Sequence, residues 1–243
     1  SPTSILLGGD RLNEDLQLGA RITVSTWLDP SEEFGVQARY WNAGDQDDIF
    51  RFDSSTHAIL ARPFFNTSVA GDFENDTQLV SFPGDLNGNL AVESTSSVQG
   101  LDIQLRRRLY QDRFTRVDWI SGYQHVSIDE GLVISSTSSV IGTDNTISVR
   151  DSFFTDNSFH GGSYGFMSTR NIARWKMETM FRLGLGNLRR EVSIAGSTTT
   201  SGGGQTNTVP EGLLARNTNS RNFVDDTFIV IPEVGFTLAY NLR

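Results

Sequence analysis

Polar and apolar residues alternate position by position along several stretches of this chain, and this pattern restricts the fold more than any other feature. From residue 16 to 28 the even positions are mostly apolar, whereas the odd positions are mostly polar or small. After Asp29 and Pro30 the alternation resumes over residues 34–41. A period of two indicates a β-strand with one apolar face, and a short turn between two such strands predicts a hairpin.

The hairpin pattern returns twice, and one further strand follows near the end of the chain. These additional strands are expected over residues 101–109, 117–124, 158–168, 175–186 and 228–240. Helical periodicity is hard to find anywhere in the chain. The sequence therefore predicts an all-β protein with seven clear strands.

The connections are short inside each hairpin and long between hairpins. Long loops are expected over residues 42–97, 129–157 and 188–224. Strict alternation of short and long connections places every long loop at one end of the sheet, which is typical of outer-membrane barrels. We therefore predict an antiparallel up-and-down transmembrane β-barrel with short turns on one side and long loops on the other. A soluble secreted β-sandwich is the alternative, because its strands alternate in the same way.

A single β-barrel domain is expected to occupy residues 1–243. Seven is an odd number of strands, whereas single-chain bacterial barrels close with an even number. An open sheet in lipid would leave backbone groups unpaired, at a cost of several kcal/mol each. The domain is therefore expected to be incomplete at both ends, with closing strands outside this chain or supplied by another subunit.

Composition excludes several other classes of protein. A formal net charge of −9 argues against nucleic acid as a partner, because phosphate binding needs a basic surface. The chain has no Cys, which removes disulfide scaffolds, thiolate metal sites and Cys nucleophiles. No apolar stretch approaches the roughly 18 residues of a transmembrane helix.

Charged residues gather on the face opposite the apolar one, which would line the lumen of a barrel. Seven of these residues are positive and four are negative. The candidates for lining the lumen are Arg21, Arg39, Asp102, Arg106, Arg108, Arg116, Asp118, Lys176, Glu178, Arg182 and Glu233. Arg can bond a carboxylate through two parallel N–H groups, so ion pairs are expected inside the lumen.

No motif assembles a catalytic or metal site. The three histidines, His57, His125 and His160, have no spacing that fixes a catalytic partner. Residues 85–93 partly match a calcium-binding loop, but Leu90 stands where the loop requires Gly. We therefore expect no enzyme activity, no catalytic residues, no metal and no cofactor.

Short motifs in order along nearly the whole chain resemble one known family. They are GGDRLN at 8–13, LGARI at 18–22, TWLDP at 26–30, ILARPFFN at 59–66, LRRRL at 105–109, GY at 122–123, DEGL at 129–132, FHGG at 159–162, LGN at 185–187, EGLLA at 211–215 and IPEVG at 231–235. By these motifs the chain resembles the putative β-barrel porin family of planctomycete-type bacteria. The resemblance implies a barrel in the bacterial outer membrane. The expected partners are outer-membrane lipid and, because the number of strands is odd, other subunits that complete or surround the barrel. The family offers no catalytic residues to carry over.

Two functions remain open at this point. The first is porin-like passage of small hydrophilic solutes, with a slight preference for anions because the lumen carries more Arg than carboxylate. The second is a structural or surface-display barrel whose lumen is closed by Arg–carboxylate pairs. The resemblance favours the first.

Overall fold

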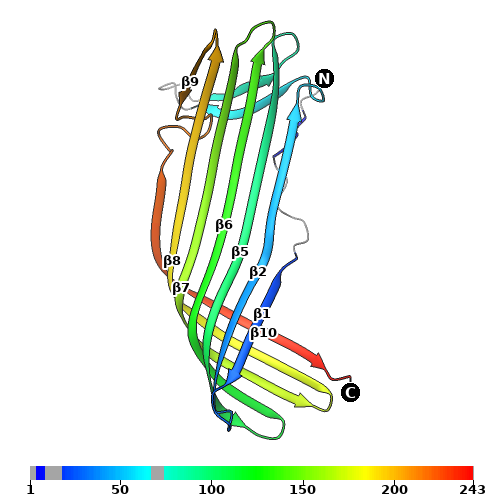
Figure 1. Cartoon of the computed structure of the whole chain (residues 1–243), viewed down its shortest axis with the longest axis vertical. Helices are drawn as coiled ribbons and strands as arrows, with labels where there is room; N and C mark the ends of the chain where they lie inside the picture. Colours follow the sequence, from blue (N-terminus) through cyan, green and yellow to red (C-terminus); the bar gives the residue numbers. More distant parts are fainter. Residues whose placement is uncertain (1–3, 9–17, 67–73, 243) are drawn as a thin grey trace.

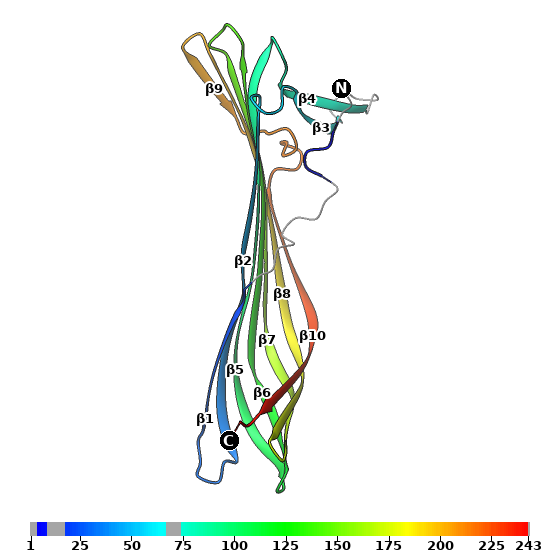
Figure 2. The same cartoon turned by 90° about the vertical axis from the view of Figure 1, so that its right-hand side faces the viewer.

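The computed structural model describes residues 4–8, 18–66 and 74–242, and its main feature is a long antiparallel sheet (Figures 1 and 2). Its main path contains seven strands in the order β1-β2-β5-β6-β7-β8-β10. They are β1 (Ala20–Trp27), β2 (Phe34–Asp53), β5 (Leu86–Gln111), β6 (Thr115–Val140), β7 (Thr146–Ile172), β8 (Trp175–Gly202) and β10 (Asn222–Tyr240). β9 (Gln205–Val209) pairs with β8, while β3 (Leu60–Asn66) and β4 (Glu74–Ser81) form a separate hairpin. The predicted all-β, antiparallel fold is confirmed.

All seven predicted strands are present in this sheet. The first was expected from residue 16, but residues 16 and 17 lie outside the described part of the chain. In the described residues, no helix is long and apolar enough to cross a membrane.

Three short turns lie at the same end of the sheet, here called the turn end. They cover residues 28–33, 112–114 and 173–174. Asp29 closes the first of them, because its carboxylate accepts hydrogen bonds from the backbone N–H groups of Glu33 (2.9 Å) and Phe34 (2.7 Å). These bonds, together with one from the Ser31 hydroxyl, lower the pKa of Asp29 to about 2.

The opposite end, here called the upper end, differs from the sequence prediction. The expected long loops 42–97, 129–157 and 188–224 are largely strand, so these boundaries are wrong. β5, β6, β7 and β8 are each 26 to 28 residues long, and only five residues, 141–145, join β6 to β7. The upper parts of the strands carry polar residues on both faces, so they lack the alternation that reveals a strand in sequence.

The sheet has two faces. The face that carries Arg39 is here called the inner face, and the face that carries Tyr40 is called the outer face. Strand register places Arg39, Asp102 and Gln124 in one row across the inner face of β2, β5 and β6. Tyr40 and Leu101 lie in the neighbouring row, on the outer face. The face of every residue along the sheet follows from this register.

Near the turn end, the polarity of the two faces is the reverse of a soluble sheet. Inner-face Arg182, Asp102 and Asp118 are almost completely buried. Outer-face Val234 and Phe236 are 78% and 64% exposed. A soluble antiparallel sheet buries its apolar face and exposes its polar face, so this part of the sheet is suited to an apolar surrounding.

The sheet curls near the turn end, so that the far strand β10 returns towards β1 and β2 (Figure 2). Arg39 of β2 bonds Glu233 of β10 across the interior at 3.0 Å, although the two strands stand far apart in the sheet order. Within the described residues, no backbone pairing joins β1 to β10, so the sheet is curved but open. A single curved sheet with a charged inner face does not have the two facing apolar sheets of a β-sandwich.

The inner face at the upper end is covered by the β3–β4 hairpin and by the segment around residues 212–215. Figure 2 shows both on the same side of the sheet. Asp151 of β7 holds both segments against the sheet. Its carboxylate forms an ion pair with Arg62 of β3 at 2.5 Å. It also accepts hydrogen bonds from the backbone N–H groups of Leu214 and Ala215 at 2.8 and 2.9 Å. The carboxylate of Asp151 is completely buried, and these donors replace the water it has lost.

Candidate functional site: the charged interior

Four charged residues from four strands meet in the interior. Asp102 of β5 bonds Arg39 of β2 at 2.8 Å and Arg182 of β8 at 2.9 Å. Glu233 of β10 bonds the same two arginines, with Arg39 at 3.0 Å and the Arg182 Nε at 3.1 Å. Two arginines and two carboxylates thus form a closed, neutral set, here called the central cluster.

The central cluster is deeply buried. Arg182 is 0% exposed, Asp102 is 1% exposed, and the amide of Gln104 donates a further hydrogen bond to Asp102 at 2.8 Å. Removing such charges from water costs several kcal/mol per ion, and only close pairing with full hydrogen bonding offsets that cost. The cluster therefore fixes β2, β5, β8 and β10 relative to one another.

A second ionic group, here called the turn-end cluster, lies nearer the short turns. Asp118 bonds Arg106 at 2.6 Å and Arg116 at 2.9 Å, and Arg116 also bonds Glu32 of the first turn at 3.1 Å. The guanidinium groups of Arg106 and Arg116 lie 4.9 and 3.9 Å from the ring centre of Trp27. Cation–π contact adds to the ion pairs here, so the turn-end cluster ties the first hairpin to β5 and β6.

The remaining predicted lumen residues lie at the margins of these clusters. Arg108 bonds Glu33 of the first turn at 3.1 Å. Lys176 and Glu178 are 3.9 Å apart and more exposed. Arg21 of β1 lies beside Trp41 in the strand register and lines a cavity with it. The structure thus gathers seven of the eleven candidates into two clusters, and the other four lie around them.

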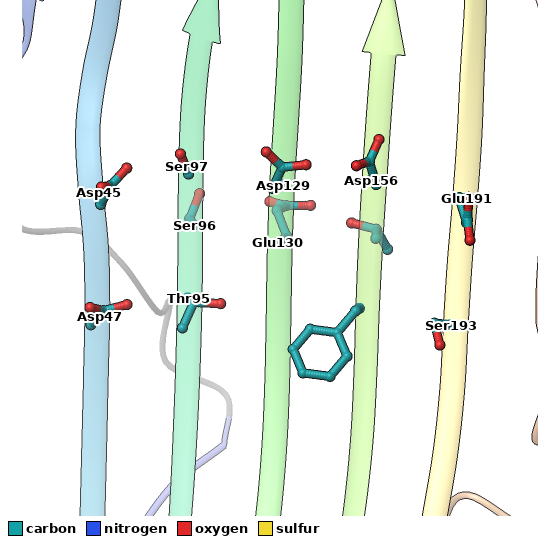
Figure 3. Close-up of a pocket in the computed structure, with 12 residues that line it drawn as sticks. Asp45, Asp47, Thr95, Ser96, Ser97, Asp129, Glu130, Asp156, Glu191 and Ser193 are labelled. Atoms are coloured by element: carbon teal, nitrogen blue, oxygen red, sulfur yellow. The ribbon is translucent and has the colours of Figure 1, made fainter.

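An acidic groove on the outer face of the upper sheet was not foreseen from the sequence. Its lining carboxylates come from four strands, in the order Asp45 and Asp47 (β2), Asp129 and Glu130 (β6), Asp156 (β7) and Glu191 (β8), and Figure 3 shows them side by side. Phe154 and several Ser and Thr residues complete its lining. Sequence reasoning assigned these residues to loops, so their alignment in one row could not be seen. In the part of the chain that the structure describes, no cluster of three or more His, Asp or Glu is arranged to hold a metal ion.

The histidines do not form a recognisable catalytic arrangement in the described structure. His125 and His160 stack with ring centres 4.3 Å apart on the outer face. The Nδ1 of His160 lies 2.5 Å from the Tyr123 hydroxyl, and its Nε2 lies 3.2 Å from the Ser158 hydroxyl. Tyr, with an apolar ring and a polar hydroxyl, is common where an apolar band meets water.

Comparison with known proteins identifies the family. The family model described as "Putative beta barrel porin-7" matches residues 1–243. The chain belongs to this family. The match confirms the resemblance to β-barrel porins read from the sequence motifs, and membership of a porin family favours a non-enzymatic role. No curated protein and no solved structure matches the chain.

Proposed function

We propose that this protein is an outer-membrane β-barrel that lets small hydrophilic solutes pass through a charged interior. The observation that carries the proposal is the reversed polarity of the sheet near the turn end. Arg182 and Asp102 are buried inside, whereas Val234 and Phe236 are exposed outside. Lipid against the outer face would stabilise this arrangement, because apolar side chains on the outside and charges on the inside suit a hydrocarbon surrounding.

The extent of the outer apolar band supports a membrane span. On β10 the outward residues from Phe228 to Leu238 are Phe228, Val230, Pro232, Val234, Phe236 and Leu238. Those positions cover about 11 residues, which is the length of a tilted transmembrane strand. Tyr40, His125 and His160 lie in the row of Phe228, where a bilayer interface would lie.

We propose outer-membrane lipid as the partner of this surface, because its exposed side chains are apolar. In a bilayer the two edges of the sheet, β1 and β10, would also need hydrogen-bonding partners, since unpaired backbone groups are costly there. We propose that further strands or other subunits supply them.

Membrane insertion and passage are tested separately. We expect the full-length protein, extracted in detergent, to give two gel bands, one for the unboiled and one for the boiled sample, because closed barrels resist SDS until heated. We then expect stepwise conductance in a planar bilayer. A protein that is soluble without detergent and runs at the same position before and after boiling would contradict the barrel. A heat-dependent shift without conductance would contradict only the passage of solutes.

A closed structural barrel is the second candidate, and the central cluster favours it. The side chains of Arg182 and Asp102 are buried in the interior. The ion pair between Arg39 and Glu233 joins β2 to β10 across it. Small barrels are commonly filled by their own side chains. Conductance absent from the wild type but present in Glu233→Ala would identify this second function.

A further inference from the structure

A cavity of about 400 Å³ lies beside the central cluster on the inner face. Its lining comes from residues 19–21 of β1 and the preceding segment, from Trp41 and Asn42 of β2, from Gln124 of β6, and from the cluster residues Arg39 and Glu233. Concave sites of a few hundred Å³ with a few convergent polar groups are typical of small-ligand binding. The chain therefore has a candidate binding site next to the central cluster.

The aromatic wall of the cavity is Trp41, which packs against Gly100 of β5. A Cβ atom on Gly100 would lie 2.5 Å from the indole ring, so the glycine lets the ring lie against the sheet. Trp27 packs on Gly35 in the same way, but the guanidinium of Arg116 covers its ring at 3.9 Å. Among the described residues no cation is found over Trp41, and Trp41 is part of the lining of the cavity.

The charge of the cavity is positive. Arg39 and Glu233 are already bonded to each other and to the central cluster. Arg21 is exposed, and no ion pair within the described residues engages it. Because Arg21 is the direct cross-strand neighbour of Trp41, its exposed guanidinium group stands beside the aromatic wall.

We propose that this cavity binds a sugar acid, that is, a monosaccharide carrying a carboxylate. Arg21 bonds the carboxylate through its paired N–H groups, and the apolar face of the sugar ring packs on Trp41. Gln124 and Glu233, two inner-face residues that line the cavity, supply hydrogen-bonding groups for the hydroxyls. This proposal rests on the proposed function, since a solute that crosses the interior would meet this site beside the central cluster.

The test is calorimetric titration of the full chain, folded in detergent micelles, with glucuronate, glucose and acetate as separate probes. Glucuronate is expected to bind saturably, and glucose and acetate at least tenfold more weakly, because each lacks one of the two recognised groups. Arg21→Gln and Trp41→Leu are each expected to weaken glucuronate binding at least tenfold.

Two matched variants change the same residue types outside the cavity. Arg107→Gln and Trp175→Leu lie on the outer face and are expected to leave binding unchanged. The heat-dependent gel shift shows that each variant is folded. Equal affinity of wild type and Arg21→Gln would overturn the site, and equal affinity for glucuronate and glucose would overturn the sugar acid. Binding does not depend on conductance, so a barrel that conducts without binding glucuronate contradicts this inference alone.

Discussion

The buried guanidinium of Arg182 shows how single residues hold this molecule together. It serves two carboxylates on two other strands, Asp102 on β5 and Glu233 on β10. Arg suits this role because its planar group offers five donors and stays charged when buried. A Lys at the same place could not bond two carboxylates in fixed directions.

Replacement of Arg182 tests this role. Arg182→Met is expected to lower the free energy of unfolding by about 3–5 kcal/mol, because it leaves buried carboxylates without their partner. Urea titration of the folded protein in micelles measures the change. Arg189→Met is the control: the side chain is half exposed and 3.6 Å from Glu191, so a change within about 0.5 kcal/mol is expected. Equal losses in both variants would contradict a structural role for the central cluster.

Asp29 gives a pH dependence at the turn end. Its pKa is about 2 in the folded chain and 3.8 without these contacts, because backbone N–H groups bond the ionised carboxylate. A lowered pKa means that the unfolded chain binds the proton more readily, so this stabilisation is full above about pH 4 and is lost as the pH falls towards 2. Asp29→Ala should therefore unfold more easily than wild type at pH 7, and the difference should disappear near pH 2. A difference that is the same at both pH values would contradict this account.

Strands near the turn end could be predicted from the sequence, whereas the upper parts could not. Residues 175–186 alternate, with Met180 as the exception, because one face is apolar and the other carries the interior charges. Further along the same strand, residues 196–201 are Gly, Ser and Thr, which suit either a loop or a strand with two polar faces. The β3–β4 hairpin was missed for another reason: Pro63 interrupts its alternation and argues against a central strand.

The interior charges were predictable as a set but not as pairs. Their alternation places Arg39, Asp102 and Glu233 on one face, and Arg–carboxylate pairing follows from chemistry. The bond between Arg39 and Glu233 joins residues 194 positions apart and depends on how far the sheet curls. Curvature is a property of seven strands together, so no local pattern indicates it.

At the scale of elements, Asp151 is the point where two segments are fastened to the upper sheet. Asp151→Ala is expected to speed amide hydrogen exchange roughly tenfold or more both in the β3–β4 hairpin and around residues 212–215, because both lose a bond to the carboxylate. Arg62→Ala should speed exchange in the hairpin alone, since Leu214 and Ala215 keep their acceptor. Mass spectrometry of the exchanged peptides distinguishes the two patterns. Arg150→Ala, at an exposed neighbouring residue, is the control. Faster exchange of the hairpin and of residues 212–215 in this control would contradict the assignment to Asp151.

At the scale of the whole molecule, the outer face of the sheet has two parts of different polarity. Near the turn end the outer face is apolar, and beyond the row of Tyr40 and His160 it becomes polar and acidic. The upper strands therefore continue out of the proposed membrane as a sheet instead of ending in loops. β8, with 28 residues, is much longer than a membrane crossing needs, and its upper part would stand outside the proposed membrane.

Two apolar positions on the outer face test this division directly. Val230 and Phe154 are 51% and 46% exposed, so they are equally open to their surroundings. Val230 lies in the row of Gly162, eight residues along β7 from Phe154, which corresponds to roughly 27 Å of strand.

The chain has no Cys, so Val230→Cys and Phe154→Cys each give one site for an environment-sensitive dye. In lipid vesicles the dye at position 230 should emit as in hydrocarbon and be quenched by lipid-bound quenchers, while the dye at position 154 should emit as in water and be quenched by iodide. If both positions report water, the apolar outer face does not meet lipid, and the proposed membrane span is wrong.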